Sequence, residues 1–117
     1  MCDKKKKKCK KRSPQAQIFQ EKLCGNFKGI SDPATAIPIW SAPLDDYIQG
    51  TFEVFNSSAS TGPLLGTITS QPSATDLEIF PGNSQAKSVL NPTSFTITAG
   101  SGDSGTWCIN LYKRIQV

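Results

Sequence analysis

The sequence contains no histidine, one methionine and no long apolar run. Histidine is the commonest metal ligand and a frequent acid–base catalyst near neutral pH, so its absence removes the best candidate for either role. No stretch approaches the 18 or so apolar residues of a transmembrane helix, and we therefore expect no membrane partner. The basic beginning of the chain runs into polar SPQAQ rather than an apolar signal segment, which predicts synthesis in the cytoplasm without a signal peptide.

Patterns typical of enzymes are weak in this chain. Asp45 and Asp46 adjoin a proline-rich stretch and are expected to form a turn rather than an acid–base pair. The glycines at 100, 102 and 105 fit neither a phosphate-binding loop nor a dinucleotide-binding turn, because no strand–helix unit follows them. The sequence therefore predicts a protein that is not an enzyme and has no cofactor.

The first 14 residues, MCDKKKKKCKKRSP, have a composition unlike the rest of the chain. Eight of the first twelve side chains are basic and one is acidic, whereas residues 13–117 carry five basic and eight acidic side chains. After Met1 this segment has no aliphatic or aromatic side chain to bury, and its charges repel one another. We predict an extended, flexible arm over residues 1–14 and a mildly acidic body over residues 15–117. Their opposite charges could bring the arm of one molecule to the body of another.

The body consists of short apolar and β-branched segments separated by turn residues, and no segment has the period of a helix. Alternation is clearest in YIQGTFEVFN, where Ile48, Phe52 and Val54 share one face. The segments expected to form strands are residues 15–24, 47–56, 64–70, 75–80, 86–90, 94–98 and 105–117. This pattern predicts an all-β fold, a jelly-roll β-sandwich of about eight strands.

Two segments of the body are expected to interrupt the strands. Residues 30–46 contain three prolines and predict a loop or, at most, an edge strand. Gly25-Asn26 predicts a turn or a bulge after the first strand.

The side-chain alternation of the first and last strands predicts where two of the four cysteines point. Trp107, Ile109 and Leu111 fall on one face of the last strand, and Cys108 falls on the other. If the apolar set faces the core, Cys108 faces solvent, and the same test places Cys24 outward on the first strand. Free cysteines are usually buried, so two outward ones suggest a bond to something else.

The arm cysteines have the surroundings of reactive thiols. Cys2 and Cys9 lie among ammonium groups, which favour the thiolate that attacks and forms disulfides. Twelve extended residues span about 40 Å, more than the width of a domain of this size. The arm could therefore bond to Cys24 or Cys108 of a neighbouring copy once an oxidant is present.

Other arrangements of the cysteines stay open. Cys24 and Cys108 could bond to each other if their strands are neighbours, and the arm cysteines could stay free or pair locally. Zinc is disfavoured, because four-cysteine sites normally contain closely spaced pairs, whereas Cys2 and Cys9 have six residues between them. We expect no metal.

The basic arm also fits a second function, since lysines that neutralise phosphates bind nucleic acid. The acidic body and the lack of aromatic residues for base stacking disfavour nucleic acid as a partner. The alternative is nevertheless a jelly-roll coat or binding module whose arm grips nucleic acid.

Three short motifs give the chain a resemblance to a known family. A first strand IFQEKLC follows a cysteine-bearing arm, a strand GTFEVFN follows later, and SGTWCINLY lies in the last strand. In this layout the chain resembles the endospore appendage (Ena) fibre subunits of Bacillus over essentially its whole length.

The resemblance implies a function and a location. It implies a structural subunit of a self-assembling, pilus-like fibre on the endospore surface, made in the mother cell. Its partners would be copies of itself, associated through sheet edges, with other spore-surface proteins as further candidates. Carried over by position, Cys2 and Cys9 resemble connector cysteines, and Cys24 and Cys108 resemble the acceptors on subunits of the adjacent layer. The polylysine connector with widely spaced cysteines favours the ladder-like (L-type) subclass, in which stacked rings are joined through connectors.

Overall fold

The computed structural model describes residues 3–4, 7–8, 16–71 and 73–116. The strands are β1 (Asp3–Lys4), β2 (Lys7–Lys8), β3 (Ala16–Lys28), β4 (Thr35–Ser41), β5 (Gln49–Asn56), β6 (Leu64–Ser70), β7 (Ala74–Ile79), β8 (Ser84–Leu90), β9 (Pro92–Ala99) and β10 (Ser104–Gln116). Within these ranges the structure contains no helix that could span a membrane.

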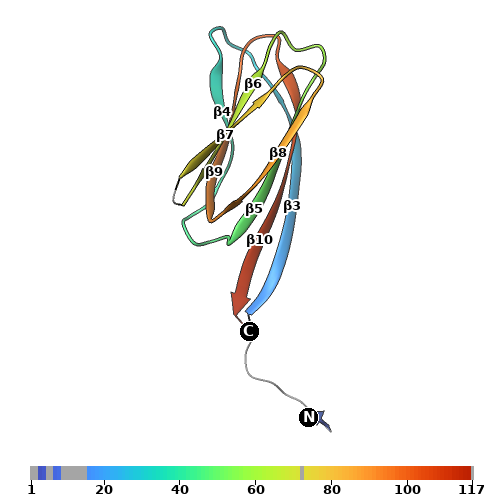
Figure 1. Cartoon of the computed structure of the whole chain (residues 1–117), viewed down its shortest axis with the longest axis vertical. Coiled ribbons are helices and arrows are strands. Elements are labelled where there is room, and N and C mark those ends of the chain that lie inside the picture. The colour runs from blue at the N-terminus through green and yellow to red at the C-terminus, as the bar shows by residue number, and fades with distance from the viewer. Residues whose placement is uncertain (1–2, 5–6, 9–15, 72, 117) are drawn as a thin grey trace.

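In the described part of the body, eight strands form two four-stranded antiparallel sheets (Figure 1). The first sheet has the order β3-β10-β5-β8 and the second the order β4-β9-β6-β7. Successive strands alternate between the two sheets except β6 and β7, which form a hairpin within the second sheet, and this order is that of a jelly roll, so the predicted fold is confirmed. In the arm, β1 and β2 pair antiparallel over two residues each, a length that is marginal in water. The extended arm over residues 1–14 stays a prediction.

The core fills the space between the two sheets with alternating side chains from both. Phe52 of β5 and Phe95 of β9 are fully buried, and their ring centroids lie 5.1 Å apart across the interface. The other buried apolar residues are Phe27, Tyr47, Val54, Leu64, Ile68, Leu77, Ile79, Val89, Ile97, Ala99, Ile109 and Leu111. Because Ile109 and Leu111 face this core, the predicted orientation of the last strand is confirmed.

The proline-rich segment forms an edge strand. Among the strands that the structure describes, β4 lies at the edge of the second sheet and pairs only with β9, with an irregularity in register between Pro38 and Trp40. Proline has no N–H to donate, so it is tolerated at an edge and at bulges. The turn or bulge predicted at Gly25-Asn26 is wrong, because β3 continues through both residues to Lys28 in an unbroken register with β10.

The two longest strands extend beyond the sandwich. β10 pairs with β5 only from Gly105 to Tyr112, but with β3 from Ser104 to Gln116. Among the described residues, Lys113–Gln116 therefore pair only with β3, and together they form a two-stranded ribbon. Figure 1 shows this ribbon extending beyond the ends of the other strands, toward the chain termini.

Polar contacts fix the β4–β5 connection to β3 and β10. The Tyr47 hydroxyl donates a hydrogen bond of 2.5 Å to Glu21 on β3. The pKa of Tyr47 is raised to about 12, mainly by this hydrogen bond and to a smaller extent by burial. The Lys113 ammonium lies 3.8 Å from an Asp46 carboxylate oxygen and 5.1 Å from the centre of the Tyr47 ring.

Asp103 joins three connections at the opposite end of the sandwich. Its carboxylate accepts hydrogen bonds from the Thr61 amide at 2.9 Å, the Thr61 hydroxyl at 2.8 Å and the Gly100 amide at 3.1 Å. Burial opposes the ionisation of Asp103, but the bonds from Thr61 and Gly100 outweigh it and lower its pKa below the ordinary value. The Asp103 backbone carbonyl accepts a hydrogen bond from the Gly29 amide at 2.8 Å.

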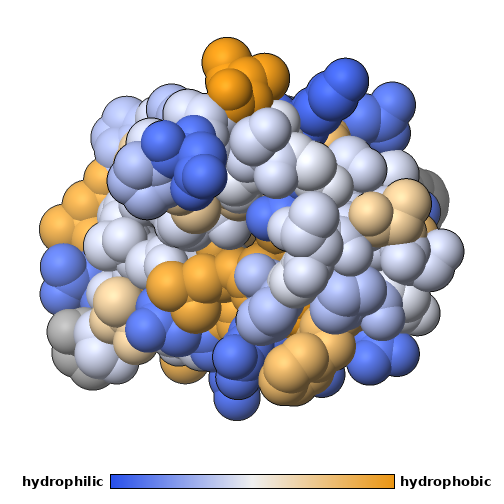
Figure 2. Space-filling view, turned by 90° about the horizontal axis from the view of Figure 1, so that it is seen from above, coloured by the Kyte–Doolittle hydropathy of each residue, from blue (hydrophilic) through white to orange (hydrophobic). Residues whose placement is uncertain are grey.

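Viewed from this end, the apolar surface is divided into patches by polar residues (Figure 2).

Candidate functional site

The candidate site is a pair of cysteines on the solvent side of the first sheet. The register of β3 and β10 places Cys24 directly opposite Cys108, with their Cα atoms 4.1 Å apart, and the two form a disulfide. Cys24 is exposed and Cys108 is half-buried, while Ile109, the next residue after Cys108, is fully buried. The outward orientation predicted for both cysteines is therefore confirmed.

This bond corresponds to one of the arrangements that the sequence left open, pairing within one body. The acceptor role of Cys24 and Cys108 toward another subunit stays a prediction. Cys2 and Cys9, the predicted connector cysteines, lie outside the residues that the structure describes. Over the described ranges, no cluster of three metal-ligating side chains occurs.

The surface around the disulfide can be derived from the strand register. Across the sheet, Cys108 lies between Cys24 on β3 and Glu53 on β5, and Glu53 in turn lies opposite Ala86 on β8. Glu53 is exposed, so a carboxylate lies beside Cys108 on the side away from Cys24. Lys22 lies two residues before Cys24, on the same face of β3 and exposed. The bond therefore has a cation near its Cys24 end and an anion beside its Cys108 end.

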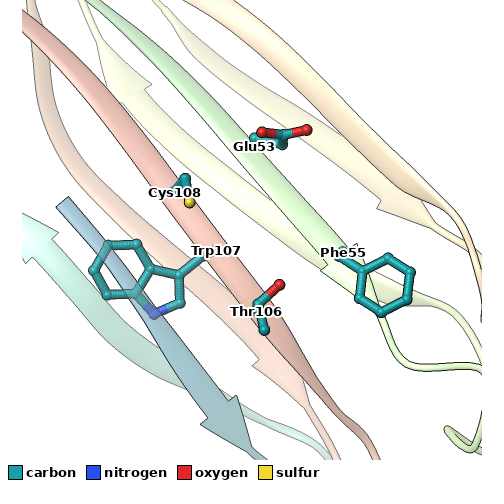
Figure 3. Close-up of a pocket in the computed structure, with 5 residues that line it drawn as sticks. All are labelled: Glu53, Phe55, Thr106, Trp107 and Cys108. Carbon is teal, nitrogen blue, oxygen red and sulfur yellow. The ribbon is translucent and has the colours of Figure 1, made fainter. Parts of the chain in front are cut away.

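A shallow hollow adjoins Cys108 on the β5 side. Its lining consists of Glu53, Phe55, Thr106, Trp107 and Cys108. Figure 3 shows Glu53 and Phe55 on β5 and Thr106 and Cys108 on β10, while the Trp107 indole points the other way, toward β3. Because β10 runs between β3 and β5, the hollow and Cys24 lie on opposite sides of Cys108.

Gly25 explains why the strand beside the cysteines is regular. It lies opposite Trp107 in the β3–β10 register, and a Cβ at this position would come within 2.7 Å of the Trp107 ring. Without a side chain, the indole can lie across β3 and pack against the core. The large ring therefore holds β3 against β10 one position beyond the disulfide.

Sequence reasoning missed Glu53 and the hollow. The alternation of residues 47–56 does place Glu53 on the solvent face, but only the sheet order brings β5 beside β10. That order depends on pairing between segments far apart in the chain, for which the local pattern contains no signal. The local signal could identify outward residues, but not which of them are neighbours.

Comparison with known proteins supports this reading of the fold. A family model for endospore appendages matches residues 7–115. A solved Bacillus endospore appendage, described as one of a novel family of disulfide-linked pili, superposes with a TM-score of 0.72 at 18% identity, over 94% of this chain and 98% of that chain. Comparison with curated protein sequences finds no match.

Two further solved structures are more distant. The infectious bursal disease virus Gx strain structure has a TM-score of 0.39 at 11% identity, over 87% of this chain and 33% of that chain. A family 11 carbohydrate-binding module from a Clostridium thermocellum cellulase has a TM-score of 0.30 at 9% identity, over 90% and 86%. Neither similarity is close enough to carry an argument. The appendage family model spans almost the whole chain, and the chain therefore belongs to the endospore appendage family.

Proposed function

We propose that this chain is the structural subunit of a self-assembling, disulfide-crosslinked appendage on the endospore surface. The observation that carries the proposal is the cysteine pair on the solvent face of β3 and β10, in a chain of the endospore appendage family. A disulfide acceptor must be reachable from outside the subunit, and the exposed Cys24 meets that condition.

Residues 1–14 act as the connector and residues 15–117 as the jelly-roll domain. Cys2 and Cys9 of one subunit bond to Cys24 and Cys108 of subunits in the adjacent layer. Each new bond made from two thiols releases two electrons and two protons, with molecular oxygen as the acceptor after the mother cell lyses. The opposite charges of connector and body bring the reacting groups together before any bond forms.

Noncovalent assembly within a layer uses the sheet edges. β8 and β4 are edge strands, and most of their residues are exposed. Unpaired backbone groups on such edges can add a strand from another copy. We place the fibre in the ladder-like subclass, with stacked rings joined through connectors, because the connector cysteines are widely spaced.

The remaining assignments follow from the family and the sequence. The subunit is a building block rather than an enzyme, and it is made in the mother-cell cytoplasm. Other spore-surface proteins are further candidate partners. The alternative, a coat or binding module whose arm grips nucleic acid, is not favoured, because the family match includes most of the lysine-rich arm.

Denaturing electrophoresis of air-oxidised protein, with and without reductant, tests the crosslinking. We expect a ladder or gel-excluded material that collapses on reduction to the 12.6 kDa chain. The Cys2→Ser/Cys9→Ser variant should remain a single band in both lanes, because it has no connector thiol. Negative-stain images of the oxidised protein then distinguish stacked rings from a helix.

A single band for the natural sequence in every lane would contradict the proposal. Nucleic acid would be tested next by a mobility shift at low and high salt, since binding through phosphate contacts weakens steeply as salt rises.

A further inference from the structure

We propose that the Cys24–Cys108 disulfide is the preformed acceptor for crosslinking, and that Cys9 of a neighbouring subunit attacks the Cys108 sulfur from the hollow and releases Cys24. This inference rests on the proposed function and specifies its covalent step. The step is an exchange between a thiolate and a disulfide, so it differs from oxidation of two free thiols.

The exchange conserves bonds and electrons. A bond forms between the sulfurs of Cys9 and Cys108, and the bond between Cys108 and Cys24 breaks. Cys24 leaves with the electron pair of that bond and takes up, through water, the proton that Cys9 gave up. One disulfide is present before and after the step, so no oxidant is consumed.

The position of the hollow selects the sulfur that is attacked. A thiolate approaches a disulfide opposite the leaving sulfur, because it must overlap the antibonding orbital along the bond. Cys24 lies on the β3 side of Cys108 and the hollow lies on the β5 side. Figure 3 shows the Cys108 sulfur beside this space, with Glu53 and Phe55 beyond it on β5. A group bound in the hollow is therefore placed for attack on Cys108.

The charges around the bond favour the same direction. Negative charge builds up on the leaving sulfur, and the ammonium of Lys22 on the same face stabilises it at Cys24. Glu53, beside Cys108, opposes negative charge on the Cys108 sulfur. Cys24 is also exposed, so water can solvate its thiolate.

Charge complementarity identifies the occupant of the hollow. Cys9 is flanked by Lys8 and Lys10, whereas Cys2 is flanked by Met1 and Asp3. A carboxylate in the hollow attracts the lysine-flanked cysteine and opposes the one beside an aspartate. Glu53 is thus a positioning residue, because it holds the connector and takes no part in bond exchange.

The test mixes two full-length variants without oxygen or any other oxidant. The acceptor is the oxidised Cys2→Ser/Cys9→Ser variant, with its Cys24–Cys108 bond confirmed by intact mass. The donor is the reduced Cys2→Ser/Cys24→Ser/Cys108→Ser variant, whose only thiol is Cys9. Alkylation, non-reducing electrophoresis and peptide mapping then identify the bonds.

We expect a one-to-one crosslinked product in which Cys9 is bonded to Cys108 and Cys24 is alkylated. A link to Cys24, or no link at all, would overturn the inference. The matched reaction uses pre-reduced acceptor in air. If only this second reaction gives crosslinks, the proposed function stands and exchange is wrong, whereas failure of both reactions contradicts the two together.

The role of Glu53 has a readout that a change in folding would not mimic. Glu53→Gln should slow the exchange about fivefold at low salt, and this difference should vanish at high salt. Glu78→Gln, on an exposed position of β7 in the other sheet, is the control and should leave the rate unchanged. Glu53→Lys should react slowly with the natural connector and recover with a Lys8→Glu/Lys10→Glu donor. Failure of that recovery would refute the positioning role.

Discussion

Reduction of Cys24–Cys108 should cost the isolated subunit a large part of its stability. The bond joins residues 84 positions apart, so it closes almost the whole body into a loop. Loop-closure entropy for a loop of this length corresponds to about 4.5 kcal/mol. A domain of this size typically has a free energy of unfolding of about 5–15 kcal/mol. The reduced body should therefore be much closer to its unfolding limit.

Urea unfolding of the Cys2→Ser/Cys9→Ser variant, with and without reductant, measures this effect. Trp40 and Trp107 are packed against the core and provide the fluorescence signal. With a slope of about 1.5 kcal/mol per molar urea, the midpoint should fall by roughly 3 M on reduction. A variant that also carries Cys24→Ser and Cys108→Ser should unfold near the reduced midpoint in both conditions. A shift below about 0.5 M would refute the reasoning and show that the bond adds little to the β3–β10 ladder.

Two further predictions concern the end of the sandwich opposite the ribbon. Because the pKa of Asp103 is lowered on folding, its contribution to stability is present above the ordinary carboxyl pKa near 4 and is lost as pH falls through the folded value. Asp103→Asn should therefore lower the free energy of unfolding by about 2 kcal/mol at pH 7 and by less at low pH. An equal loss of stability at the two pH values would contradict this prediction. Gly29→Ala should lower the free energy of unfolding by about 3 kcal/mol, because its Cβ would collide with the Gly100 carbonyl and come within 2.9 Å of the Ala99 backbone. Gly62→Ala is the control, since a Cβ at Gly62 would meet nothing within 4 Å. Thermal unfolding of the two glycine variants compares them directly, and similar melting temperatures would count against the predicted collision.

The fold class could be predicted from the sequence because alternation and turn residues are local signals. Ile109 and Leu111 face the core as their alternation indicates, and Cys108 between them faces outward. The limits of single strands were harder to predict. β3 continues through Gly25 because Trp107 of a distant segment lies against it, and glycine accommodates the ring.

The cysteine pairing could not be predicted for a related physical reason. Whether Cys24 and Cys108 can bond depends on their register across two strands more than 80 residues apart in the chain. A shift of one residue would have placed one of them on the other face. The same long-range pairing brings Glu53 beside Cys108, so neither the intrachain bond nor the hollow has a signature in the local sequence.

The ribbon formed by the ends of β3 and β10 puts Cys24 and Cys108 out of reach of Cys9 of the same chain. Ala16, where β3 begins, is eight strand positions from Cys24, or about 26 Å. Cys9 is only seven residues before Ala16, and those residues would have to turn back along β3 to reach Cys24. Reversing direction takes at least two of them, and the remaining five span about 17 Å at most. Cys9 therefore cannot reach Cys24 or Cys108 of its own chain, so any bond between Cys9 and this pair has to join two copies of the protein.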